Sequence, residues 1–138
     1  MKKELYFAYG SNLHHEQMKG RCPDSSPVGK AVLFDYQLIF RRVADIIPCE
    51  GEAVTGAVYM VSEEDKKALD IYEGYPRLYN RVWVPVLVEG KGMTKAFLYI
   101  MNGGKKSPPP KYYFDIIKQG YRHWGLSFSS LKTALRNV

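Results

Sequence analysis

A short apolar run, Leu5 to Ala8, leads directly into the turn-forming sequence Tyr9-Gly10-Ser11-Asn12 near the start of the chain. A short apolar run bounded by such turn residues is typical of a buried strand, and the polar stretch from His14 to Arg21 predicts a short helix. A strand-to-helix turn exposes several unpaired backbone N–H groups, which favour a bound anion. The sequence therefore predicts either an anion-binding turn or an ordinary connection between a strand and a helix.

The residue types in this turn lead to two more specific predictions. Gly10 allows a ligand to approach the backbone closely, or the backbone to take a positive φ angle. Ser11 and Asn12 have side-chain oxygens of the kind that accept hydrogen bonds at helix N-caps. The turn is therefore expected to present its backbone and to cap the helix that follows.

Composition and charge narrow the class of protein. The chain has 138 residues, 46% of them hydrophobic and 25% charged, which is typical of one globular domain spanning residues 1–138. Its net charge is +6, but the basic residues are scattered in pairs, so we expect no nucleic-acid partner. No apolar run is long enough to span a membrane and no signal peptide is recognisable, so no membrane association is expected.

Only two cysteines, Cys22 and Cys49, occur in the sequence. They could form one disulfide, but they cannot supply a four-thiolate zinc site, and no nearby histidine spacing completes a zinc finger. We therefore expect free thiols in a reducing cytoplasm and no bound metal.

The pattern of apolar residues and turn residues predicts an α+β or mixed α/β domain of about six strands with a curved or barrel-like sheet. Loops are expected at residues 22–29 and 102–110, and an irregular segment at 43–52. Strands are expected at residues 5–8, 30–34, 36–41, 53–61, 78–88 and 94–101, and helices at 14–21, 63–72, 111–124 and 128–136.

One carboxyl group stands out by its position. The helix that begins after the N-cap Ser62 ends at Glu73, directly before Gly74 and among aromatic residues. The helix dipole and the apolar neighbours both disfavour a negative charge there, so the pKa of Glu73 should be raised. A carboxyl group with a raised pKa can carry protons near neutral pH. The alternative is a solvated glutamate in front of a Gly-Pro turn.

Three motifs occur in a fixed order along the chain. They are Tyr9-Gly10-Ser11-Asn12-Leu13, then Leu69-Asp70-x-x-Glu73-Gly74 with Tyr79, then Ser107-Pro108-Pro109-Pro110-Lys111-Tyr112 with Gly120-x-x-x-x-Gly125-Leu126. In this the chain resembles the gamma-glutamylcyclotransferase-like family, which includes the AIG2-like proteins, from Tyr6 to about Leu135. The resemblance implies a small mixed β-barrel with flanking helices, which agrees with the α+β fold class predicted from the residue pattern.

The resemblance also implies an activity. Family members convert a γ-glutamyl amine or γ-glutamyl amino acid to 5-oxoproline and a free amine, because the substrate's α-amine attacks its own γ-carbonyl. Glu73 would carry the protons, and no metal or cofactor would be needed. The alternative is a non-catalytic member of the same fold that binds a small metabolite.

The binding residues that the resemblance implies are the turn residues Tyr9, Gly10, Ser11, Asn12 and Leu13, which would hold the γ-glutamyl group. Tyr79 and Tyr112 would border the pocket, with Tyr113 as the alternative to its neighbour Tyr112, and Tyr99 is a less secure candidate. Arg81 is expected to pair with an acidic side chain rather than with a substrate carboxylate. The loop at residues 102–110 is expected to border the pocket and to influence which leaving group is accepted.

Overall fold

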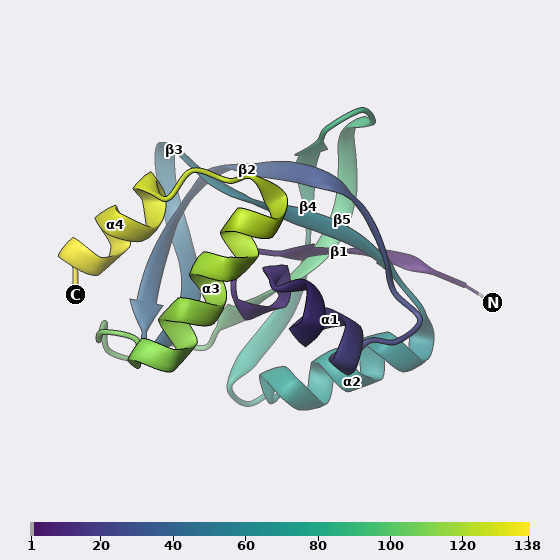
Figure 1. The fold of residues 1–138 in the computed structure, drawn as a ribbon, viewed down its shortest axis with the longest axis horizontal. Helices are drawn as coiled ribbons and strands as arrows, with labels where there is room; N and C mark the ends of the chain where they lie inside the picture. The colour runs from purple at the N-terminus through teal and green to yellow at the C-terminus, as the bar shows by residue number, and fades with distance from the viewer. Residues whose placement is uncertain (1) are drawn as a thin grey trace.

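The structure, a computed structural model, describes residues 2–138 and forms a closed barrel of five strands in the order β1-β3-β2-β4-β5 (Figure 1). Helices cover the outside of the barrel, so the predicted α+β fold with a small mixed barrel is confirmed. The elements are β1 (Glu4–Ala8), η1 (Ser11–Leu13), α1 (His15–Arg21), β2 (Ser26–Arg41), β3 (Val43–Val61), α2 (Glu63–Glu73), β4 (Tyr79–Val88), β5 (Gly92–Met101), α3 (Lys111–Trp124) and α4 (Ser129–Arg136).

The first strand makes the barrel mixed. β1 runs antiparallel to β3, with Tyr6 opposite Tyr59, and parallel to β5, with Tyr6 opposite Phe97. The other pairs are antiparallel, and the predicted strands at residues 78–88 and 94–101 form a hairpin as β4 and β5. Tyr6 therefore lies on the strand that joins β3 to β5 within the barrel.

The long hairpin of β2 and β3 corrects the sequence prediction. The strands expected at residues 30–34 and 36–41 are one strand, which begins earlier, at Ser26. Its register with β3 shifts at Val28 and again at a bulge at Asp35. The segment 43–52, expected to be irregular, belongs to β3. The bulge accommodates Pro48 and Gly51, the turn-forming residues that led to the wrong prediction. Pro48 pairs with Tyr36, and the Gly51 N–H donates to the Asp35 carboxylate at 3.1 Å.

The helices follow the sequence more closely. α2 begins after the predicted N-cap Ser62, which forms a capping box with Asp65, and it ends where Gly74 takes a left-handed conformation with φ of 68°. In Figure 1, α1 and α2 lie side by side under the barrel, and α3 crosses in front of it. α3 contacts the η1 turn closely, because a Cβ at Gly120 would lie 2.8 Å from the backbone N of His14.

The barrel interior holds the hydrophobic core, to which all five strands contribute buried side chains. Within residues 2–138, Cys22 and Cys49 are both free thiols, and burial raises the pKa of Cys22 to about 12. None of the helices in this range has the length and apolar character needed to cross a membrane.

Candidate active site

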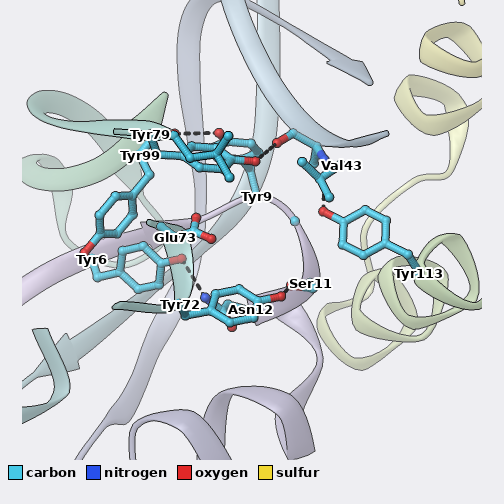
Figure 2. A pocket seen from close by; sticks show the side chains of 13 residues that line it. Tyr6, Tyr9, Ser11, Asn12, Val43, Tyr72, Glu73, Tyr79, Tyr99 and Tyr113 are labelled. Atoms are coloured by element: carbon cyan, nitrogen blue, oxygen red, sulfur yellow. Dashed lines mark hydrogen bonds between the residues drawn. The ribbon is translucent and has the colours of Figure 1, made fainter. Parts of the chain in front are cut away.

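A cavity of about 200 Å³ opens where the turn after β1 meets α2, β3, β4 and α3 (Figure 2). Its walls are mainly aromatic, since six tyrosines contribute to them. The lining residues are Tyr6, Tyr9, Gly10, Ser11, Asn12, Val43, Ala44, Tyr72, Glu73, Leu78, Tyr79, Tyr99 and Tyr113. The structure therefore brings together the two sequence features that stood out, the Tyr-Gly-Ser-Asn turn and Glu73.

Glu73 is the one charged side chain among these lining residues, all of which lie in the described part of the chain. Figure 2 shows its carboxyl group among the tyrosine rings. Within residues 2–138 no hydrogen-bond donor of the protein contacts this carboxylate. Burial raises the pKa of Glu73 to about 7, although the positive charge of Arg21 acts in the opposite direction. The predicted direction of this pKa shift is confirmed.

The turn from Tyr9 to Leu13 is tightened by the short 3₁₀ helix η1, in which the Leu13 N–H donates to the Gly10 carbonyl at 3.1 Å. The backbone N–H groups of Gly10, Ser11 and Asn12 have no acceptor among residues 2–138, as expected for a helix start. Three unpaired donors therefore belong to residues that line the cavity. That these N–H groups bind an anion stays a prediction.

The structure decides between the alternatives at Gly10 and corrects the predicted helix cap. Gly10 has a φ of −124°, so it does not use a positive φ, but a Cβ there would lie 3.2 Å from the Cβ of Ala44, so glycine allows a close approach. Ser11 and Asn12 do not cap α1. The cap is His14, whose Nδ1 accepts from the Gln17 N–H at 3.3 Å, because η1 separates the turn from α1.

Tyrosine hydroxyls fix the cavity wall to the backbone. Tyr9 donates to the Tyr99 carbonyl at 2.5 Å, and Tyr79 donates to the Ala44 carbonyl at 2.7 Å. The Ala44 N–H donates to the Tyr113 hydroxyl at 2.9 Å. Burial raises the pKa of Tyr9, Tyr79 and Tyr113 above the ordinary range, so all three stay neutral near pH 7. The wall therefore presents fixed neutral dipoles around a single ionisable carboxyl group.

Two predicted site residues lie outside the cavity. The Leu13 side chain is fully buried in the core, and its carbonyl accepts a hydrogen bond from the Trp124 indole N–H at 3.0 Å. Tyr112 is 72% exposed and does not line the cavity. Tyr113 lines it instead, because successive residues of a helix point in directions about 100° apart.

Sequence reasoning missed other lining residues. Tyr6 and Tyr72 belong to segments that were assigned to packing, and the irregular structure expected at residues 43–52 gave no reason to select Val43 or Ala44. Leu78 follows the Gly-Pro turn. One of the missed residues could have been selected from the sequence. Tyr113, the alternative to Tyr112, lies on the apolar stripe of α3 and was therefore the better candidate for the cavity wall.

Of the remaining two expectations about the site, one is confirmed and one is wrong. Arg81 pairs with Asp70 at 2.6 Å, as expected for an ion pair within the protein. The loop at residues 102–110 contributes no lining residue, contrary to expectation. It is tied to β2 instead, since Ser107 donates to the Phe40 carbonyl at 3.0 Å and accepts from the Arg42 N–H at 3.1 Å.

The contrast between Tyr112 and Tyr113 gives a direct test of the cavity wall. Tyr113→Phe removes the acceptor of the Ala44 N–H and should lower ligand affinity or catalytic efficiency about fivefold, since a buried donor is left unpaired. Tyr112→Phe is the matched control and should behave as wild type. Equal effects of the two changes, measured by ligand titration or steady-state kinetics, would contradict this assignment of the wall.

Within the described residues, no three His, Cys, Asp or Glu side chains come together as a group that could hold a metal ion. Fold and cavity together define a class: a small mixed barrel in which a Gly-Ser-Asn turn and one partly buried carboxyl group line the same cavity. The chain belongs to the family described as gamma-glutamyl cyclotransferase, AIG2-like, whose sequence profile matches residues 6–121.

Named relatives agree with this assignment. The gamma-glutamylcyclotransferase of Homo sapiens is 32% identical over 136 residues, covering 88% of this chain and 72% of that protein. The gamma-glutamylcyclotransferase of Bos taurus is 31% identical over 139 residues, with the same two shares. A solved structure named gamma-glutamyl cyclotransferase superposes with a TM-score of 0.87 at 27% identity, covering 96% of this chain and 86% of that chain.

Proposed function

We propose that this protein is a cyclotransferase that converts a γ-glutamyl amine or γ-glutamyl amino acid to 5-oxoproline and a free amine. The observation that carries the proposal is the single carboxyl group of Glu73, with a pKa of about 7, in a cavity that also presents unpaired backbone N–H groups. The names of the relatives support the reaction class.

Glu73 would act first as a base. Its carboxylate takes a proton from the α-ammonium of the substrate, and the freed amine attacks the γ-carbonyl carbon to close a five-membered ring. A pKa near neutrality suits both accepting and returning a proton. Because the nucleophile and the electrophile belong to one molecule, the main task of the cavity is to hold the substrate folded.

Glu73 would then act as an acid. The C–N bond to the leaving group breaks as Glu73 returns its proton to the leaving nitrogen. The α-nitrogen enters with three protons and ends as a lactam N–H with one. One of the two protons lost is therefore passed on by Glu73, and the other reaches the released amine through solvent.

The turn would bind the glutamyl end of the substrate. The N–H groups of Gly10, Ser11 and Asn12 are suited to a carboxylate or to a carbonyl oxygen that gains negative charge. Gly10 matters here because a larger residue would press against Ala44 in the opposite wall.

The proposed role of Glu73 predicts the pH dependence. Because the reaction needs the ionised carboxylate, kcat/KM should rise with pH and level off above about 7, the pKa of Glu73. Below that pH it should fall about tenfold per unit. Rates measured from pH 5 to 9 should show this limb, whereas a midpoint near the ordinary glutamate value would remove the raised pKa from the mechanism.

A panel assay tests the function and separates it from non-catalytic binding. The protein is incubated with γ-glutamyl amines and γ-glutamyl amino acids, and 5-oxoproline is measured. Release from at least one class, with catalytic turnover, supports the cyclotransferase. Calorimetric binding of these compounds with no release would favour the binding protein of the same fold.

A further inference from the structure

Arg21, the last residue of α1, lies outside the cavity lining but contacts residues of its wall. Its guanidinium donates to the Asn12 side-chain oxygen and, at 3.0 Å, to the Gln17 side-chain oxygen. The same group lies over the ring of Tyr72, 3.4 Å from the ring centroid. One side chain therefore links α1 to η1 and to the end of α2.

The contact with Arg21 decides which way the Asn12 amide points. A guanidinium has only donors, so the atom of Asn12 that faces it must be the oxygen. The amide nitrogen must then face the other way, toward the Tyr6 hydroxyl, to which it donates at 3.0 Å. Figure 2 shows this bond at the cavity wall.

The orientation of Asn12 in turn decides how the Tyr6 hydroxyl is used. Its oxygen accepts from Asn12, so its own hydrogen is not used in that bond. Burial and then the charge of Glu73 raise the pKa of Tyr6, so the hydroxyl keeps its proton. Three groups in sequence, Arg21, Asn12 and Tyr6, therefore donate in the same direction, and the last donor belongs to the cavity.

We propose that Arg21 is a positioning residue, which aligns Asn12 so that the Tyr6 hydroxyl donates to the γ-carbonyl oxygen of the substrate. This inference rests on the proposed cyclotransferase reaction, in which that oxygen gains negative charge as the ring closes. A preorganised donor at such an oxygen stabilises the transition state more than the substrate.

Arg21 also acts on Glu73 through its charge. The titratable groups whose charges interact with that of Glu73 are Arg21 from α1 and the hydroxyls of Tyr6 on β1, Tyr9 in the turn, Tyr79 on β4 and Tyr113 on α3. The hydroxyls are neutral, and Arg21 lowers the pKa of Glu73. Loss of the Arg21 charge should therefore move the acid limb of kcat/KM to higher pH, whereas loss of a neutral hydroxyl should not.

A double-mutant cycle tests the inference. Tyr6→Phe should lower kcat about 100-fold, as removal of an oxyanion donor does, and Arg21→Gln about tenfold. The double variant should lie within about threefold of Tyr6→Phe, because both changes interrupt the same chain. Arg21→Lys should recover most of the loss, and Lys19→Gln, which removes an exposed positive charge from the same turn of α1, should act as wild type.

Losses that multiply in the double variant, or an Arg21→Gln protein with a lower melting temperature but unchanged kcat and pH profile, would overturn the inference. A readout without turnover separates its failure from that of the proposed function. The side-chain NH₂ signals of Asn12, assigned by their loss in Asn12→Asp, should be protected from solvent exchange in wild type and Lys19→Gln but not in Arg21→Gln. Unprotected wild-type signals overturn the hydrogen-bond chain, and protected signals without 5-oxoproline release overturn the catalytic role.

Discussion

Replacing Glu73 by glutamine is expected to lower kcat/KM for 5-oxoproline release about 1000-fold while leaving the fold intact. Glutamine keeps the size of the side chain but cannot accept and return a proton, and general acid–base groups contribute of this order. The change is measured by steady-state kinetics. Glu64→Gln, an exposed change on the same helix, is the control and should keep wild-type rates.

The same variant gives an independent check through stability. The pKa of Glu73 is raised in the folded state, so the folded protein binds more protons than the unfolded chain between about pH 4.5 and 7. The stabilising contribution of the protonated group is thus present at low pH and is lost as pH rises through about 7. Glu73→Gln should therefore melt higher than wild type at pH 8, with little difference at pH 4. A lower melting temperature at pH 8 would contradict a partly buried carboxylate without a hydrogen-bond donor.

The second large effect is expected at Gly120, on the face of α3 that contacts the η1 turn. A Cβ at this position would lie 2.8 Å from the backbone N of His14 and the carbonyl carbon of Leu13, so Gly120→Ala forces the helix away from the turn. Overpacking of this kind costs about 2 to 3 kcal/mol of unfolding free energy. Because the turn carries the proposed substrate-binding amides, activity should fall as well.

Gly20→Ala is the matched control, since Gly20 also lies in a helix but has no atom within 4 Å of the position a Cβ would take. It should raise stability by up to about 1 kcal/mol, because alanine favours the helix. Denaturant melts of the two variants should thus differ in sign. A Gly120→Ala protein with wild-type stability and full activity would show that the close contact of α3 does not position the turn.

The sequence predicted those parts of the site that depend on local rules. Ser62, Glu73 and Gly74 were identified because caps, helix ends and dipoles are local effects, and the strand before Tyr9 ends where a Gly-Ser-Asn turn requires it. The order of the three motifs then selected the fold. The small mixed barrel, and a pocket formed by the turn and Glu73, were predicted because the motifs in this order resemble those of a known family.

The rest depends on long-range pairing. The Asp35 bulge aligns Pro48 with Tyr36, and so extends β3 through a segment whose proline and glycine indicated turns. That extension brings Ala44 between Tyr79 and Tyr113, which no local pattern around Ala44 could indicate. The contact between Arg21 and Asn12 similarly depends on how α1 folds back over η1.

The most direct test of the proposed chemistry follows the substrate's own nitrogen. A γ-glutamyl substrate labelled with ¹⁵N at the α-amine is incubated with the wild-type protein, and the products are analysed by mass spectrometry. Intramolecular attack should give 5-oxoproline that retains the label in its ring, together with an unlabelled free amine. Labelled glutamate formed without the lactam, or no product from either class of γ-glutamyl compound, would contradict the cyclotransferase mechanism.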